Sequence, residues 1–204
     1  MNQTKTSKQS SPDLILGSAS PRRRELLAQL GVNFQVHASD IDETPLPDEP
    51  PSAYVARLAE AKSSAVMAEV GDAVPVLGAD TIVVSQGELL GKPADEADAV
   101  RMLSALSGRE HQVMTAVCLR DKDRHEVVVV VSDVTFRELT PADISAYWQS
   151  EEPKGKAGAY AIQGLGATFI SAMKGSYSGI VGLPLYETDQ LLKSFAVSTR
   201  LHPR

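Results

Sequence analysis

The sequence predicts an α/β fold whose sheet is mixed rather than purely parallel. Short apolar runs typical of strands alternate along the chain with segments of helical periodicity, as in α/β proteins. Several neighbouring strand runs are separated only by tight turns, and such hairpins make their strands antiparallel. The chain has 204 residues, 43% of them hydrophobic, which is enough for one large domain or two small lobes around a shared cleft.

The first predicted strand and helix have the clearest local pattern. Residues 14–16 form a short apolar run that predicts a buried strand. A helix then begins, with Ser20 as its N-cap and Pro21 at the first helical position, where a missing N–H group costs nothing. Its apolar stripe ends at Gly31, a residue suited to the left-handed conformation after a helix. Residues 32–36 predict a second strand.

The middle of the chain predicts a long helix followed by strands. An acidic, proline-rich loop over residues 40–51 leads into a helix over residues 52–69, which Gly71 stops. Two strand runs follow at residues 74–77 and 82–84, interrupted by a Gly-Ala-Asp tripeptide.

The remaining elements are a hairpin and further helices. We expect a turn at residues 86–87, a helix over 95–106, strands over 111–119 and 127–137, a helix over 141–149, strands over 159–162 and 168–171, and a helix over 185–195. These elements form one domain of two lobes over residues 13–196, and residues 1–12 and 197–204 read as loose tails.

Composition limits the classes of function. The net charge of −6 and the pI of about 5.2 argue against a general nucleic-acid binder. The single cysteine, Cys118, lies in an apolar run and is expected to be a buried hydrophobic residue. The chain has no signal peptide and no apolar run long enough for a membrane span, so we expect a cytoplasmic protein. P-loop, zinc-ligand and Ser-His-Asp patterns are absent, and His111 is expected to be a structural or surface residue.

The turn after the first predicted strand is suited to an anion. A helix N-terminus presents free N–H groups and a partial positive charge of about +0.5. Ser18 and Ser20 add hydroxyl groups there, and residues 22–24 add three arginines. Cations in a first helical turn oppose the helix dipole, so a bound phosphate would explain their placement. The alternative is an ordinary exposed basic turn.

Two charged residues stand out within apolar patterns. Lys62 falls on the apolar stripe of its predicted helix, where it either snorkels outward, the reading the pattern favours slightly, or faces a polar cavity. Asp80 stands among apolar strand residues, either in an exposed turn or as a carboxylate that holds a metal or activates water. Asp40, Asp42 and Glu43 of the acidic loop are candidates for a second carboxylate.

A glycine-rich stretch near residues 154–164 is a further candidate. Its lysines and glycines would let backbone approach a ligand closely. The Gln163 amide offers a donor and an acceptor side by side, which matches the O4 and N3–H edge of uracil or thymine. The flipped amide matches cytosine equally well, so this residue alone does not choose between the bases. The alternative is a β-turn in which Gln163 has no special role.

Taken together, these residues resemble the Maf family, the septum-formation-inhibitor-like nucleotide pyrophosphatases. Each matching block is weak alone, but together and in order they are highly specific, and they span roughly residues 14–195. The blocks are Ser18-Ala19-Ser20-Pro21-Arg22-Arg23, Asp42-Glu43, Lys62, Gly78-Ala79-Asp80-Thr81, Lys92-Pro93, Ser107-Gly108-Arg109 with His111, Val113 and Thr115, Lys156-Ala157-Gly158-Ala159-Tyr160 with Ile162-Gln163-Gly164, and Gly175-Ser176-Tyr177 with Val181-Gly182-Leu183-Pro184.

The resemblance implies a two-lobed mixed α/β fold similar to inosine triphosphate pyrophosphatases, and a site in the cleft between the lobes. It implies Asp80 as proton acceptor and metal-side carboxylate, and Glu43 as a second metal-side carboxylate for Mg²⁺ or Mn²⁺. It further implies two groups of substrate-binding residues. The triphosphate group is Ser18, Arg23, Lys62, Lys92 and Lys156, and the group that separates the branches of the family is Arg22, Thr81 and Gln163.

At these last three positions the sequence resembles the dTTP/UTP branch of the family. The resemblance therefore implies hydrolysis of dTTP and UTP to monophosphate and pyrophosphate, with housekeeping of the nucleotide pool, a possible link to cell-division arrest and a homodimer. Two alternatives stay open: a 7-methyl-GTP or purine-specific pyrophosphatase, and a non-catalytic nucleotide-responsive regulator of division. Gly155 departs from the family pattern, which often has Asp before the lysine of Lys-Ala-Gly.

Overall fold

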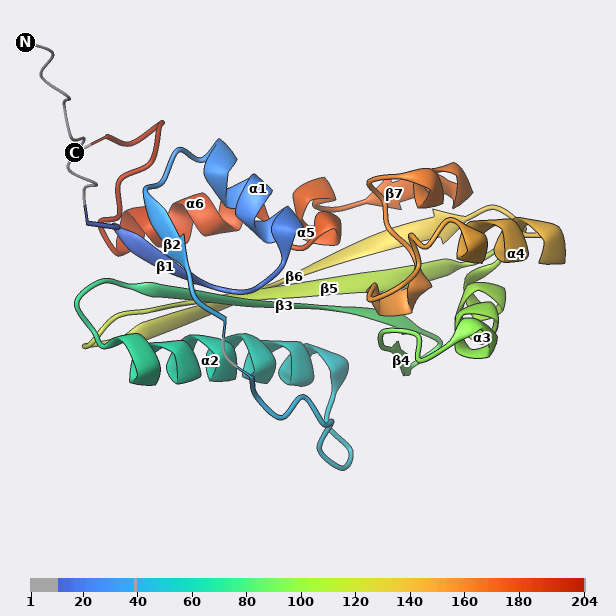
Figure 1. Cartoon of the computed structure of the whole chain (residues 1–204), viewed down its shortest axis with the longest axis horizontal. Helices are drawn as coiled ribbons and strands as arrows, with labels where there is room; N and C mark the ends of the chain where they lie inside the picture. The colour runs from blue at the N-terminus through green and yellow to red at the C-terminus, as the bar shows by residue number, and fades with distance from the viewer. Residues whose placement is uncertain (1–10, 39, 204) are drawn as a thin grey trace, which may run out of the picture.

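The computed structural model describes residues 11–38 and 40–203. Within these ranges, seven strands form a single long, twisted sheet (Figure 1). The strands are β1 (Leu14–Gly17), β2 (Phe34–Val36), β3 (Val76–Ser85), β4 (Glu88–Leu90), β5 (Glu110–Arg120), β6 (His125–Phe136) and β7 (Ile170–Lys174). Their order is β2-β1-β3-β5-β6-β7, and β4 pairs with β3. β1 runs parallel to β2 and β3, and the other pairs are antiparallel, so the predicted mixed sheet is confirmed.

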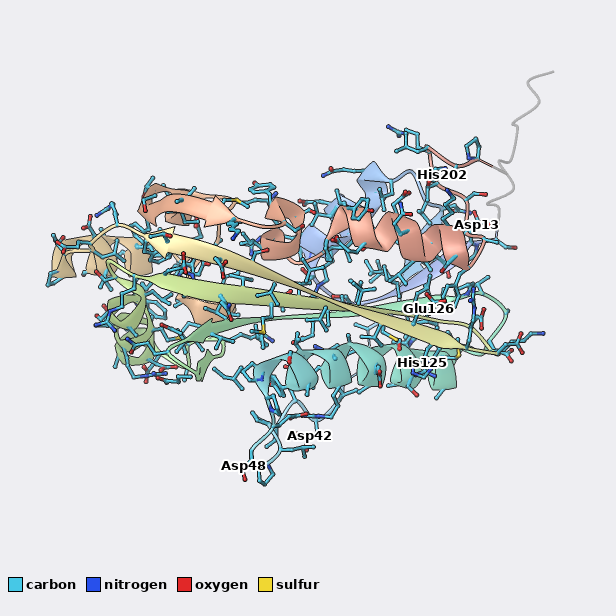
Figure 2. All side chains as sticks on the ribbon, turned by 180° about the vertical axis from the view of Figure 1, so that it is seen from behind. Asp13, Asp42, Asp48, His125, Glu126 and His202 are labelled. Carbon is cyan, nitrogen blue, oxygen red and sulfur yellow. The ribbon has the colours of Figure 1, made fainter. Side chains whose placement is uncertain are left out.

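Helices cover both faces of this sheet. They are α1 (Pro21–Gln29), α2 (Pro51–Val70), α3 (Glu96–Leu106), α4 (Pro141–Gln149), α5 (Tyr177–Val181) and α6 (Leu185–Ser194), with 3₁₀ turns η1 (Ala157–Ala159) and η2 (Leu165–Phe169). α2 lies along one face, against β3 and β5, while α1, α5 and α6 lie on the other face (Figure 1). Seen from behind, α2 and α6 again lie on opposite sides of the long strands (Figure 2).

Two separate buried clusters lie toward opposite ends of the long strands. One packs α1 and α6 against the sheet and includes Leu16, Leu27 and Leu192. The other packs α3 and α4 against the sheet and includes Leu103 and Phe136.

The strand that carries Asp80 is continuous, contrary to the predicted interruption. The Gly-Ala-Asp tripeptide pairs along its whole length with β5, where Gly78 lies opposite Cys118 and Asp80 opposite Ala116. Because Asp80 is only 8% exposed within this strand, the alternative of an exposed turn is wrong. Cys118 is buried, as expected, and its sulfur lies 3.2 Å from the Ser63 hydroxyl oxygen.

Two predictions in the C-terminal half differ from the structure. Residues 159–162 are not a strand: the chain leaves η1 irregularly, with Ala159 at a φ of 59°, and the Ala161 N–H bonds to the Tyr147 hydroxyl instead of a neighbouring strand. The strand expected at 168–171 begins only at Ile170, after the η2 turn. α5 was not predicted, because five residues leave no periodic pattern.

The chain after α6 packs against the domain rather than forming a loose tail at once. Val197 and Thr199 are buried, and the Thr199 hydroxyl donates to Asp189 at 3.2 Å. The Arg200 N–H donates to the Leu30 carbonyl at 2.7 Å. The predicted tail over residues 1–12 lies outside the described residues up to residue 10. Among the helices that the structure describes, none is long and apolar enough to cross a membrane.

Candidate active site

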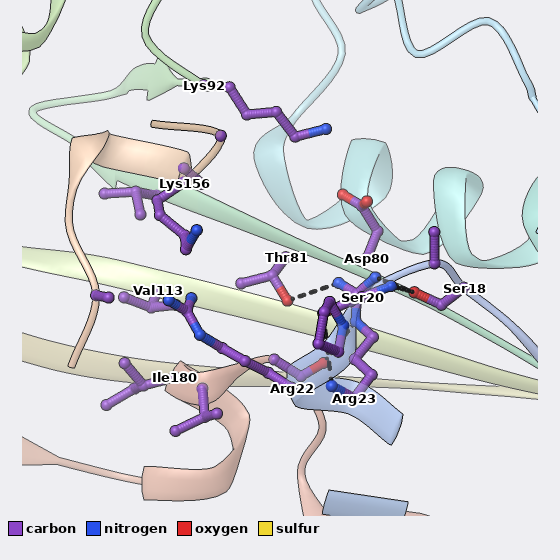
Figure 3. A pocket seen from close by; sticks show the side chains of 18 of the residues that line it. Ser18, Ser20, Arg22, Arg23, Asp80, Thr81, Lys92, Val113, Lys156 and Ile180 are labelled. Carbon is purple, nitrogen blue, oxygen red and sulfur yellow. Dashed lines mark hydrogen bonds between the residues drawn. The ribbon is translucent and has the colours of Figure 1, made fainter. Parts of the chain in front are cut away.

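A cleft of about 710 Å³ opens beside the N-terminal end of α1 and the middle of β3 (Figure 3). All ten residues that the sequence singles out line it: Ser18, Arg22, Arg23, Glu43, Lys62, Asp80, Thr81, Lys92, Lys156 and Gln163. Residues 180–182, at the end of α5, also line the cleft. Val181 and Gly182 were named from the sequence only as part of a family block, with no role in the site. The residues that the resemblance implies therefore line one cleft, although the fold brings them together from segments far apart in the chain.

The start of α1 has the local structure that its sequence predicts. Ser20 is the N-cap, and its hydroxyl accepts from the Arg23 N–H at 3.5 Å, with Pro21 in the first turn. The Ser18 hydroxyl accepts from the Ser20 N–H at 3.2 Å. The first turn of α1 contains no acidic residue, so its N–H groups and arginines give the cleft a positive wall suited to phosphate.

Arg23 is the most firmly held cation of the cleft. Its Nε donates to the Gly182 carbonyl at 2.8 Å, Nη1 to the Ser18 hydroxyl at 3.2 Å, and Nη2 to the Thr81 hydroxyl at 3.1 Å (Figure 3). Burial lowers the pKa of Arg23, while two carboxylates of the cleft, Asp80 and Glu43, act in the opposite direction. The side chain is thus fixed in place before any ligand arrives.

The hydroxyl of Thr81 is committed within the protein. Thr115 donates to the Gly179 carbonyl at 2.7 Å, and a carbonyl oxygen only accepts. Since Thr115 has one hydroxyl hydrogen, the 2.9 Å contact between the two threonines must be donated by Thr81. Thr81 then accepts from Arg23 and has no hydrogen left for a ligand. Thr81 therefore acts in this structure as a support for Arg23, and Thr115 links Thr81 to the Gly179 carbonyl in one series of hydrogen bonds.

The opposite wall of the cleft holds a cluster of one lysine and two carboxylates. Lys62 Nζ lies 2.6 Å from Asp80 Oδ1 and 2.6 Å from Glu43 Oε1. Lys92 Nζ lies 4.0 Å from Glu43 Oε2. Side-chain exposure is 14% for Lys62 and 11% for Asp80, so this pair is shielded from water. The snorkelling interpretation of Lys62 is wrong, because the ammonium group points to Asp80 rather than to open solvent.

The cluster favours the ionised form of Glu43. Partial burial opposes ionisation of Glu43, but its hydrogen bond to Lys62 and the charges of Lys62, Lys92 and Arg23 hold its pKa below the usual value. The neighbouring Asp42 is exposed, and its carboxylate accepts from the Thr44 N–H at 2.8 Å. Of this acidic pair, Glu43 is therefore the residue that faces the cleft.

Gly78 explains how α2 brings Lys62 over Asp80. A methyl group at Gly78 would lie 2.3 Å from the Ala59 carbonyl oxygen and 2.7 Å from the Ser63 N–H nitrogen. Both atoms belong to the backbone of α2, so only glycine lets the helix approach the strand this closely. The glycine of the Gly-Ala-Asp tripeptide therefore serves packing, whereas the sequence read it as a break in the strand.

The other end of the cleft carries Arg22, Lys156 and Gln163. Burial lowers the pKa of Lys156, the nearby Arg22 cation lowers it further, and Glu152 acts in the opposite direction. Gln163 is exposed on its loop and reaches the cleft. Gly155 has a φ of 68°, a left-handed conformation that Asp tolerates better than most residues, so this departure from the family pattern is compatible with the same turn.

Several residues around the cleft were not singled out as functional. Tyr160 lines it, and the Tyr160 hydroxyl lies 2.8 Å from Nε2 of His111. His111 is 3% exposed and packs edge-on to Phe136, so it is structural, as expected. Glu152 lies behind the Gln163 loop and was missed, because an acidic residue in a charged segment has no distinctive sequence pattern.

The donor set is compatible with a metal shared with a ligand. No group of three or more His, Cys, Asp or Glu side chains suited to a metal occurs in the described part of the chain. Asp80 and Glu43 nevertheless converge on a single cation, the Lys62 ammonium, at 2.6 Å each. Mg²⁺ is usually bound by one or two carboxylates together with substrate phosphates and water, which these two residues match.

A positive helix terminus and a half-buried arginine line the same cleft as a lysine-bridged pair of carboxylates. This arrangement defines an α/β protein that binds a phosphate ester beside acidic groups. The chain belongs to the Maf family, since the family described as Maf-like protein matches residues 13–195.

Two relatives cover nearly the whole chain. The dTTP/UTP pyrophosphatase of Pseudoalteromonas atlantica (strain T6c / ATCC BAA-1087) is 52% identical over 188 residues, which is 91% of this chain and 98% of that protein. The dTTP/UTP pyrophosphatase of Escherichia coli (strain K12) is 53% identical over 182 residues, or 89% and 92% of the two chains.

Similar solved structures have lower identity. The Ham1 protein of Staphylococcus aureus has a TM-score of 0.49 at 15% identity and covers 93% of this chain and 92% of its own. The nucleoside-triphosphatase / dITP/XTP pyrophosphatase of Mycobacterium abscessus ATCC 19977 / DSM 44196 has a TM-score of 0.40 at 14% identity, over 67% of this chain and 94% of its own.

Proposed function

We propose that this protein hydrolyses dTTP and UTP to the nucleoside monophosphate and pyrophosphate. Relatives that are 52–53% identical over about nine-tenths of the chain are dTTP/UTP pyrophosphatases. The observation that carries the proposal is the Lys62 cluster, in which Asp80 and Glu43 lie across the cleft from Arg23 and the start of α1. A site that only bound phosphate would gain little from carboxylates beside its anion, whereas a hydrolase needs a base there.

In this proposal the triphosphate lies between the two walls of the cleft. Arg23, the α1 N-terminus and Ser18 hold phosphate oxygens on one side, and Lys62, Lys92 and Lys156 contribute positive charge on the other. These groups neutralise the negative charge that grows on the leaving pyrophosphate. Because Arg23 is already fixed by three hydrogen bonds, little reorganisation is needed when the substrate binds.

Asp80 is the proposed base. Its carboxylate orients a water molecule toward the α-phosphorus and takes its proton as the new P–O bond forms. The bond from the α-phosphorus to the bridging oxygen breaks, and pyrophosphate leaves with that oxygen. We propose that Asp80 and Glu43 also hold Mg²⁺ or Mn²⁺ when substrate is bound. The metal would supply charge neutralisation on the phosphate oxygens and lower the pKa of bound water.

We propose that the nucleobase of the substrate binds at the end of the cleft that carries Gln163 and Arg22. The Gln163 amide matches the O4 and N3–H edge of thymine or uracil. Thr81, which matches a branch-separating position, has its hydroxyl committed to Thr115 and Arg23, so its contribution is through the position of Arg23. We further propose that the protein is a homodimer located in the cytoplasm. Its proposed role is housekeeping of the nucleotide pool, with a link to cell-division arrest.

The test is Asp80→Asn, which keeps the shape of the side chain and removes the base. We expect release of pyrophosphate from dTTP and UTP to fall by about 10²–10⁴-fold, the usual loss when a general base is removed. Near-normal turnover would refute the role of Asp80. Tight nucleotide binding by the wild type without metal-dependent turnover would instead favour the non-catalytic regulator.

A panel of nucleoside triphosphates tests the substrate. We expect dTTP and UTP to be hydrolysed with the highest kcat/KM, above dCTP and above purine nucleotides. A preference for 7-methyl-GTP or another purine nucleotide would overturn the assignment of Gln163 to pyrimidine recognition.

A further inference from the structure

The Glu152 carboxylate receives three hydrogen bonds behind the loop that carries Gln163. Its Oε1 accepts from the Tyr147 hydroxyl at 2.7 Å and from the Gly166 N–H at 2.9 Å, and its Oε2 accepts from the Leu165 N–H at 2.8 Å. An ionised carboxylate only accepts, and all three partners are donors. Burial opposes ionisation, but these three donors hold the pKa of Glu152 below its usual value.

Tyr147 extends the same contact to the other side of Gln163. Its single hydroxyl hydrogen is donated to Glu152, and its oxygen accepts from the Ala161 N–H at 3.1 Å. Tyr147 is 3% exposed, and burial together with the Glu152 charge raises its pKa, so the phenol stays protonated as a donor. Ala161, Leu165 and Gly166 are therefore all anchored to one carboxylate–phenol pair.

The glycines of the loop fit this pair closely. A Cβ at Gly164, which has a φ of 139°, would lie 2.3 Å from Glu152 Oε2. A Cβ at Gly166 would lie 2.6 Å from the Tyr147 hydroxyl oxygen and 2.5 Å from the Ala161 carbonyl oxygen. Both positions therefore require glycine if the backbone is to reach its anchors. The loop is shaped around the carboxylate on both sides of Gln163.

Gln163 lies between these anchored amides, exposed and facing the cleft. An amide that reads a base by two adjacent hydrogen bonds depends on its position, because a shift of the loop misaligns both bonds. We propose that Glu152 is a positioning residue which, with Tyr147, holds Gln163 in place and so sets the preference for a pyrimidine over a purine base. This inference rests on the proposed function, in which Gln163 contacts the base.

The first experiment compares Glu152→Gln with the wild type. The amide keeps the shape and one acceptor oxygen, but its NH₂ group faces N–H donors. We expect the ratio of kcat/KM for dTTP to that for dGTP to fall about tenfold, the order expected when one well-placed hydrogen bond is lost. The maximal rate on the poorer substrate should change little, because Lys62, Asp80 and Arg23 are untouched.

Two further variants separate positioning from charge and from general damage. Tyr147→Phe leaves the Glu152 charge in place and removes the Ala161 anchor, so it should lower the same ratio. Glu151→Gln changes the adjacent exposed carboxylate, which pairs with Lys154, and should leave the ratio unchanged. Hydrogen exchange should become faster at the Leu165 and Gly166 amides in Glu152→Gln, but not in Glu151→Gln.

A double-mutant cycle with Gln163→Ala decides the outcome. If Glu152 acts through Gln163, Glu152→Gln should not lower the ratio further once Gln163 is alanine. An additive effect, or an equal loss for every nucleotide, would overturn the inference. If Gln163→Ala removes the base preference but Glu152→Gln keeps it, the role of Glu152 is refuted, while base reading by Gln163 and the proposed function stand. If Gln163→Ala leaves the preference intact, base reading by Gln163 fails, and the inference fails with it.

Discussion

Gly78→Ala tests whether close packing of α2 on β3 builds the acidic cluster. The added methyl group would lie 2.3 Å from the Ala59 carbonyl oxygen and 2.7 Å from the Ser63 nitrogen. An ordinary carbon–oxygen contact is roughly 1 Å longer, so α2 must withdraw by about that distance. Since both contacts are backbone atoms, no side-chain rotation relieves the overlap.

The cost follows from this geometry. Overpacking a core costs typically about 1–3 kcal/mol, and a clash with backbone belongs near the upper end. For a domain of this size, about 3 kcal/mol corresponds to a fall in Tm of roughly 6–12 °C. The same withdrawal carries Lys62 away from Asp80, which it now approaches to 2.6 Å. A misplacement of about 1 Å can lower turnover by roughly 10²-fold.

Thermal unfolding and pyrophosphate release from dTTP measure these two effects. Gly91→Ala is the matched control, because a methyl group there would meet no atom within 4 Å. It should change stability by less than about 0.5 kcal/mol. If Gly78→Ala unfolded and turned over like Gly91→Ala, the close approach of α2 would not be what holds Lys62 over Asp80.

Two further predictions concern buried groups outside the cleft wall. Burial lowers the pKa of His111 from 6.5 to about 4, so the unfolded chain binds a proton at this residue more tightly than the folded protein does. The free energy of unfolding therefore decreases as the pH falls from about 6.5 toward 4. Between pH 7 and pH 5 the wild type should lose roughly 2 kcal/mol more unfolding free energy in urea than His111→Gln, and equal losses would contradict this. Thr115→Val removes the link between Thr81 and the Gly179 carbonyl, so it should cost about 1–3 kcal/mol and raise the KM for dTTP by freeing Arg23. Thr115→Ser should retain both properties, and a harmless valine would argue against the hydrogen-bond chain.

The start of α1 was predictable from the sequence because its signals are local. The apolar run, the Ser20 N-cap and Pro21 fall within a few residues, and a helix start with arginines points to an anion wherever it lies in a fold. The strands β5 and β6 and the helix α2 followed from periodicity, which depends on neighbouring residues alone. Short elements were missed or misplaced, since α5 and the 3₁₀ turns have too few residues to show a period.

Lys62 and Asp80 show where local reasoning ends. The pattern marked both residues as out of place in apolar surroundings, but it could not show that each is the partner of the other, 18 positions away. It favoured a snorkelling lysine and left open an exposed turn for Asp80. The structure shows that neither alternative holds. α2 packs closely on β3 at Gly78, and this packing shields the charges of Lys62 and Asp80 from water together.

The sequence by itself determined the α/β class and the start of α1, because propensity, capping and periodicity act over a few residues. The resemblance to a known family supplied the residues that were then found to line the cleft. Only the tertiary structure decided that Thr81 is committed to Arg23 and that Glu152 anchors the loop of Gln163. Those contacts join segments from different parts of the chain, and their hydrogen-bond directions follow only once donors and acceptors lie within 3 Å or so of one another.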